Sequence, residues 1–155
     1  MTETLGLNND SRTEIASSLT KVLAESVQLY VLSWNVHWNV TGPLFASVHA
    51  LTEEHYLELA TAVDDIAERI RALGEKAPAG LGAYQSLGAI ADGDENASAE
   101  DMVKSLIAGH EQVIKTIRPI AGKAADAGDE VTAGIMADRL TVHEKAHWML
   151  SALVA

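Results

Sequence analysis

Apolar residues recur at helical spacing along four long stretches of this chain, and these stripes constrain its fold more than any other feature. The first stretch opens at Ser11, which forms a capping-box pattern with Glu14, and it ends before Gly42-Pro43. The second runs from about Phe45 to Leu73, and Gly74 follows as a helix stop. A period near 3.6 residues predicts an amphipathic helix over each stretch.

Two further long helices are expected in the second half of the chain. The third begins at Ser98, with Asp101 three residues on as a capping partner, and Gly128-Asp129 separates it from the fourth. A glycine-rich connection, residues 75–97, joins the second helix to the third and has room for one short helix around residues 83–90. The pattern predicts helices only.

The number and order of these elements predict an architecture. Four long helices with one long central connection are typical of a ferritin-like four-helix bundle, here with a short helix in the connection between helices 2 and 3. We expect one all-α domain over residues 11–155, preceded by a short flexible tail, residues 1–10.

Composition excludes several classes of function. The chain has no cysteine, which rules out disulfides, thiolate zinc sites and thiol nucleophiles. Its net charge of −11 repels a phosphate backbone and attracts cations. The N-terminus lacks the basic and apolar regions of a signal peptide, and no apolar run approaches the roughly 20 residues that cross a bilayer. We expect a soluble cytoplasmic protein without membrane contact that binds metal ions more readily than DNA.

The segment HEKAH, residues 143–147, matches two metal-binding motifs. As H-E-x-x-H it would supply two ligands of a zinc protease, but no His, Asp, Glu or Cys follows as a third. As E-x-x-H it would be half of a di-iron site, but no other glutamate has a histidine three residues later. We interpret HEKAH as part of the last helix, which Trp148, Met149 and Leu150 would anchor to the bundle.

A more complete set of metal ligands lies earlier in the chain. His37 near the end of the first helix and His49 near the start of the second meet if these helices pack antiparallel. Asp64 and Glu68 are one helical turn apart, on the face of the second helix that also carries His49 and Glu53.

The length of the second helix decides how these ligands can combine. His49 and Asp64 are 15 residues apart, about 22 Å along a helix axis, whereas metal–ligand bonds are about 2 to 2.6 Å long. Two antiparallel copies of this helix across a two-fold axis would solve this, because the histidines of one chain would face the carboxylates of the other. Such mixed nitrogen and oxygen ligands suit Fe(II). The alternative is that the carboxylates form a solvated face and the histidines pack at helix ends.

These residues also resemble a known family. The stretch NVHWNVTGPLFASVH followed by DDIAER resembles the Dps family (DNA protection during starvation) of ferritin-like proteins. The matching pattern is His37-Trp38, Gly42-Pro43-Leu44-Phe45, His49, Asp64 and Ala67-Glu68-Arg69, and GDEVT and HEKAHWML are similar to the family's last helix. The resemblance covers most of residues 11–154.

The resemblance implies a hollow homododecamer of two-fold dimers that oxidises Fe(II), preferentially with hydrogen peroxide, and stores ferric mineral inside. It implies that His37 and His49 of one chain, with Asp64 and Glu68 of its partner, bind iron at an intersubunit site. Each site would hold at most two irons, the second one with help from Glu53. Trp38 matches a tryptophan that takes up stray oxidising equivalents; packing at the interface is the alternative.

Further roles follow from the same resemblance. Acidic residues near the start of the last helix line the pores that admit iron in such cages, and Asp129 is the best match, with Glu130 and Asp138 as further candidates. Gly134 stands where relatives often carry another acid. Glu54 is the candidate for mineral nucleation on the cavity wall.

DNA binding is the alternative function that the resemblance raises. Family members that bind DNA often use Lys-rich tails, but residues 1–11 contain neither Lys nor Arg. We therefore expect weak or no DNA binding. The alternatives kept open are a nucleoid-protection protein for which iron oxidation is secondary, and a plain helical oligomer with vestigial sites.

Overall fold

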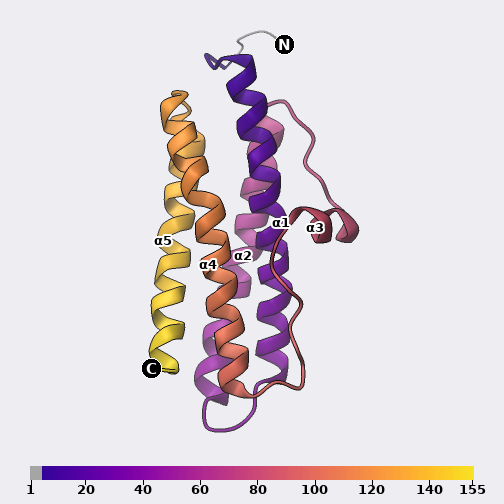
Figure 1. Cartoon of the computed structure of the whole chain (residues 1–155), viewed down its shortest axis with the longest axis vertical. Helices are drawn as coiled ribbons and strands as arrows, with labels where there is room; N and C mark the ends of the chain where they lie inside the picture. The colour runs from indigo at the N-terminus through magenta and orange to yellow at the C-terminus, as the bar shows by residue number, and fades with distance from the viewer. Residues whose placement is uncertain (1–4) are drawn as a thin grey trace.

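The computed structural model describes residues 5–155, and this part of the chain contains helices and no strand (Figure 1). The helices are α1 (Asn9–Asn39), α2 (Phe45–Ala72), α3 (Leu81–Leu87), α4 (Ala99–Asp126) and α5 (Glu130–Leu153). The all-α prediction and the number of long helices are therefore confirmed.

The four long helices form a bundle, and the short one lies outside it. α1 packs along α2, α4 packs along α5, and α1 lies against α4. The connection after α2 carries the chain from one end of the bundle to the other, so that α4 runs parallel to α2 (Figure 1). α3 sits within this connection, against α1. This is the bundle with a crossover and a short extra helix that the sequence predicts.

The start of α1 differs from the prediction. Asn8, not Ser11, is the N-cap, because its side-chain oxygen accepts hydrogen bonds from the backbone N–H groups of Asp10 (2.9 Å) and Ser11 (3.3 Å). The helix thus begins at Asn9, and Leu7 already packs into the core. The expected N-terminal tail, residues 1–10, overlaps this helix, and its residues 1–4 lie outside the described residues.

The other helix ends follow the predicted local chemistry. Ser98 caps α4 by accepting a hydrogen bond from the N–H of Asp101 (3.1 Å). Gly74 and Gly128 end α2 and α4 with φ of +93° and +74°, a left-handed conformation that glycine adopts without strain. The short helix lies slightly earlier than the expected residues 83–90, because the backbone is extended from Gly88.

The core lies between the four long helices and consists of apolar side chains from each of them, among them Leu19, Leu59, Ile66, Leu106, Ile117, Met136 and Leu150. One predicted anchor is wrong: Trp148 is 66% exposed, whereas Leu150 is fully buried. The two residues lie about 200° apart around α5, so they point to opposite sides. Among residues 5–155, no helix is long and apolar enough to cross a membrane.

Candidate metal centre

The turn between α1 and α2 brings the predicted histidines together. His37, in the last turn of α1, and His49, in the first turns of α2, have nearly parallel rings with centroids 3.7 Å apart. His37 Nδ1 lies 2.7 Å from the backbone oxygen of His49, and His49 Nδ1 lies 2.8 Å from the backbone oxygen of His37. The two residues therefore hold each other in place.

These reciprocal contacts fix the tautomer of both rings. A carbonyl oxygen only accepts hydrogen bonds, so each Nδ1 must carry the proton. In a neutral imidazole the other nitrogen, Nε2, then has a free lone pair. Neither Nε2 has a hydrogen-bond partner within the described residues. Histidine ligands of metals usually have this arrangement, in which the second nitrogen donates to a carbonyl and orients the ring.

Neighbouring side chains limit how the rings can move. His37 is buried, and its Nδ1 also lies 3.2 Å from the hydroxyl of Thr52. Tyr56 meets the His37 ring edge-on at 5.2 Å, and Phe45 stacks on His49 at 5.0 Å. A ligand pair held by packing and hydrogen bonds loses little freedom when a metal binds.

The predicted carboxylates lie elsewhere on the surface. Asp64 and Glu68 are exposed and make no hydrogen bond or ion pair with any residue from 5 to 155. α2 is one unbroken helix from Phe45 to Ala72, so the axial separation of about 22 Å between His49 and Asp64 holds. A single chain does not bring these carboxylates to the histidines.

The acidic residues closer to the histidines are also free. Glu53, one turn after His49, and Glu54 are both exposed on α2. In the described part of the chain, no three side chains of the His, Cys, Asp or Glu type are placed to hold one metal ion. The chain thus presents a fixed histidine pair without the further ligands that an iron site requires.

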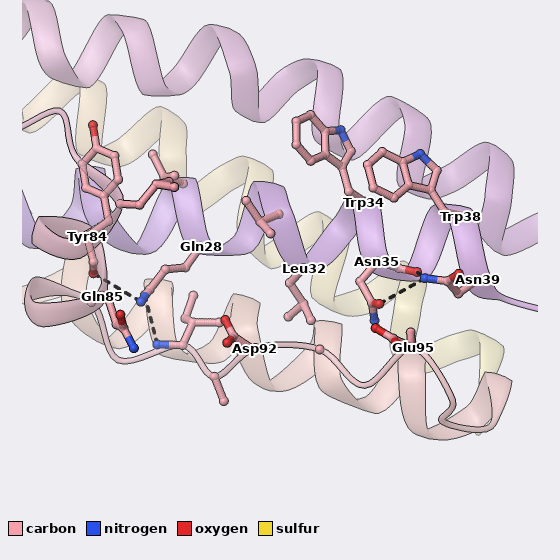
Figure 2. Close-up of a pocket in the computed structure, with 17 residues that line it drawn as sticks. Gln28, Leu32, Trp34, Asn35, Trp38, Asn39, Tyr84, Gln85, Asp92 and Glu95 are labelled. Atoms are coloured by element: carbon pink, nitrogen blue, oxygen red, sulfur yellow. Dashed lines mark hydrogen bonds between the residues drawn. The ribbon is translucent and has the colours of Figure 1, made fainter.

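Trp38 lies beside the histidine pair in sequence but makes a different contact. It is 65% exposed and stacks on Trp34, with centroids 5.3 Å apart. Both indoles project from α1 at the edge of a groove of about 690 Å³ between α1 and the connection that contains α3 (Figure 2). Leu32, Tyr84 and Asp92 also line this groove. An oxidant-quenching role for Trp38 stays a prediction.

The candidate pore residues fall into two groups. Asp129 is 3% exposed, accepts a hydrogen bond from the N–H of Thr132 (2.9 Å) and pairs with Arg69 (2.7 Å). Its carboxylate therefore caps α5 and ties it to α2. Glu130 and Asp138 are exposed, as pore residues need to be. Lining of a pore by any of the three stays a prediction.

The residues of HEKAH point to separate partners. His143 is fully buried and its Nε2 lies 2.9 Å from a nitrogen of Arg139, a cation that would repel a metal ion. On the outside, Glu144 pairs with Arg118, and His147 Nε2 lies 2.9 Å from a carboxylate oxygen of Glu111. These contacts agree with the interpretation that HEKAH is part of the last helix.

Sequence reasoning did not predict how the polar residues inside the bundle contact one another. His55, His110 and His143 meet between α2, α4 and α5, and Glu25 is fully buried on α1. The helical period places His110 on the apolar stripe of its helix, but it does not identify the histidines that meet it. The partners of these residues depend on the register between helices, which no local pattern contains.

Known proteins share this sequence and fold. The ferritin-like domain family matches residues 16–155. "DNA protection during starvation protein 2" of Bacillus anthracis is 33% identical over 91% of this chain and 97% of its own length. A Dps protein of Vibrio cholerae, described as a member of a broad superfamily of ferritin-like diiron-carboxylate proteins, superposes with a TM-score of 0.94 at 28% identity, covering 100% of this chain and 98% of that one.

A further solved structure agrees with these matches. The Dps protein of Bacillus brevis superposes with a TM-score of 0.90 at 32% identity, over 94% of this chain and 98% of that one. Agreement in sequence, in family domain and in the arrangement of all helices leads to one assignment: the chain belongs to the Dps family of ferritin-like proteins.

Proposed function

We propose that this protein is a ferroxidase and iron-storage subunit, which oxidises Fe(II), preferentially with hydrogen peroxide, and retains ferric mineral inside a hollow dodecamer. The observation that carries the proposal is the His37–His49 pair, whose Nδ1 atoms are both used by backbone carbonyls. Two imidazole nitrogens that are fixed in place and each present a lone pair suit Fe(II). The chain also matches the ferritin-like domain family.

The missing oxygen ligands would come from a second copy of the chain. Asp64 and Glu68 are exposed and without partners in the described residues, so they are free to reach across a dimer interface. In a two-fold arrangement each chain gives its histidines to one site and its carboxylates to the other. Glu53, near His49 on the same helix, would help to hold a second iron.

Exposed apolar side chains on α1 and α2 support an interface there. Val31, Trp38, Phe45 and Leu57 are 44–65% exposed. Several large apolar side chains exposed on two neighbouring helices are what a surface covered by another chain would show. Such a contact would also exclude bulk water from the iron site between the two chains.

The chemistry of such a site follows from the charges of its ligands. Two Fe(II) ions each lose one electron, and hydrogen peroxide takes both with two protons to give two water molecules, so that no hydroxyl radical is released. Carboxylates stabilise the higher positive charge of the Fe(III) product, and the neutral imidazoles hold the Fe(II) substrate without cancelling its charge.

Substitution of both histidines tests the proposal. We expect His37→Ala with His49→Ala to slow peroxide-driven Fe(II) oxidation, followed anaerobically by ferric absorbance, by at least about 10- to 100-fold, the range for perturbed metal sites. His147→Ala is the matched control, because it removes an exposed histidine outside the candidate centre. If the double variant oxidises iron at the rate of the control, the histidine pair is not the iron site.

A further inference from the structure

Three histidines from distant parts of the chain meet inside the bundle, away from the candidate metal centre. The His110 ring on α4 lies between His55 on α2 and His143 on α5, with centroid distances of 5.6 and 5.2 Å. His110 is 2% exposed and His143 is fully buried. Metal sites of four-helix bundles are built from side chains that face inward from several helices, histidines among them. In residues 5–155, however, no three such side chains are placed to hold one ion.

The hydrogen bonds of this cluster form a chain in which each residue donates to the next, starting from Arg139. The Arg139 guanidinium only donates, and its Nη2 lies 2.9 Å from His143 Nε2, so that nitrogen must accept. The His143 proton is then on Nδ1, which lies 2.9 Å from His110 Nδ1. His110 Nδ1 accepts in turn, so the His110 proton is on Nε2.

Both rings are neutral, as this assignment requires. Burial, the first cause, and the nearby Arg139 charge lower the pKa of His143 well below its ordinary value. Burial also lowers the pKa of His110 to about 3. A neutral imidazole has one donor and one acceptor nitrogen. The two carboxylate oxygens of Glu58 accept hydrogen bonds from Nη1 and Nη2 of Arg139, and this fixes the orientation of the guanidinium group.

The donor at the end of this chain, His110 Nε2, is a buried atom of a residue that lines a cavity. His110 Nε2 and His55 Nδ1 are buried and have no hydrogen-bond partner among the described residues. Both residues line a cavity of about 300 Å³, together with Glu54, Glu58 and Lys145. Buried polar atoms without a partner are uncommon in folded proteins.

A metal ion requires a lone pair that His110 does not offer. For Nε2 to become a ligand, the His110 proton would have to move to Nδ1 and the His143 proton to Nε2. The His143 N–H would then face the Arg139 N–H at 2.9 Å, with two donors opposed and no acceptor between them.

We propose that Arg139 is a positioning residue that keeps divalent metals out of the bundle interior, by orienting His143 and His110 so that His110 Nε2 carries a proton and presents no lone pair to an ion. This inference rests on the proposed function only in assigning iron to the site between subunits, and it is tested independently of that site.

Co(II) is a suitable probe, because its visible absorption reports bound histidine. In a His37→Ala, His49→Ala background, which removes the histidine pair of the candidate metal centre, we expect only weak Co(II) binding. Arg139→Met with Glu58→Gln, which removes the donor and its counter-charge together, is expected to tighten Co(II) binding by about tenfold or more. His110→Ala should abolish the gain, and Arg139→Lys, which retains a donor, should bind as weakly as the background.

Two results would overturn the proposal. The first is that the His37→Ala, His49→Ala protein binds Co(II) tightly and loses this binding when His110→Ala is added. The second is that the Arg139→Met, Glu58→Gln variant folds but binds Co(II) no more tightly than the background. A second measurement needs no variant at position 139. Nitrogen NMR of the histidine-labelled parent protein should show His110 protonated on Nε2 and His143 on Nδ1, and the opposite pair of tautomers would refute the orientation.

Discussion

Asp129 provides a sharp test of the structure, because the sequence suggests a pore residue and the contacts indicate a structural one. Its carboxylate caps α5 through Thr132 and pairs with Arg69, whose side chain is only 13% exposed. Loss of an N-cap costs about 0.5–2 kcal/mol. Loss of a buried charge partner costs about 3–5 kcal/mol.

The cost of losing the charge partner is smaller than this here, because Arg69 keeps its 2.9 Å hydrogen bond to the Thr132 hydroxyl and some contact with water. We expect Asp129→Ala to lower the free energy of unfolding by about 2–5 kcal/mol in total. Asp129→Asn keeps the capping oxygen and loses the charge, so its cost should be about 1 kcal/mol.

Urea denaturation followed by circular dichroism, at one protomer concentration for all variants, measures these differences. Glu130→Gln is the matched control, because Glu130 is the exposed neighbour and its loss should change stability by no more than about 0.5 kcal/mol. An Asp129→Ala protein as stable as this control, with slower uptake of Fe(II), would refute the structural role and favour a pore.

Three further predictions concern acid, assembly and DNA. Burial lowers the pKa of His110 in the folded protein to about 3, so at this position the unfolded chain takes up a proton first as the pH falls below about 6.5. The free energy of unfolding should therefore drop by on the order of 3 kcal/mol from pH 6.5 to 4 through this residue. In urea denaturation at several pH values, His110→Gln should make this dependence on pH less steep. Light scattering should give twelve chains of 16.5 kDa each, about 200 kDa, and a monomer would contradict the cage. Gel shifts at low salt should show little or no DNA complex, since the net charge is −11; compact complexes would favour the nucleoid-protection alternative.

Local patterns predicted most of the fold. The bounds of α2 and the N-cap of α4 agree with the prediction, because the signals that set them are local. For α2 these are the apolar stripe and the glycine that follows it, and for α4 the capping serine. The start of α1 was wrong because Asn8 and Ser11 are equally good capping residues by type, and the burial of Leu7 decides between them. The bounds of the short helix also differ from the prediction, because this helix packs against α1 and its ends depend on that contact.

The candidate site was predictable only in part. The helix rise predicts that His49 and Asp64 cannot share an ion, and the unbroken α2 agrees. The exchange of Nδ1 hydrogen bonds between His37 and His49 depends on the turn geometry and could not be read from spacing. The Arg139–His143–His110 contacts depend on the register between α4 and α5, which the sequence does not give. The burial of Asp129 could not be predicted either, because it depends on where Arg69 of α2 lies.

The central claim is that each iron site takes its histidines from one chain and its carboxylates from another. Two inactive variants test it directly: one carries His37→Ala and His49→Ala, and the other carries Asp64→Asn and Glu68→Gln. Alone, each should oxidise Fe(II) poorly, because every site lacks one half of its ligands.

Co-expression of the two variants in equal amounts, with subunit mixing checked by native mass spectrometry, changes the expected result. A mixed dimer has one site with both defects and one intact site, and half of all dimers are mixed, so about a quarter of all sites should be active. We therefore expect peroxide-driven Fe(II) oxidation to return to about a quarter of the parent rate. Mixed assemblies that stay as inactive as either variant alone would contradict a site shared between chains.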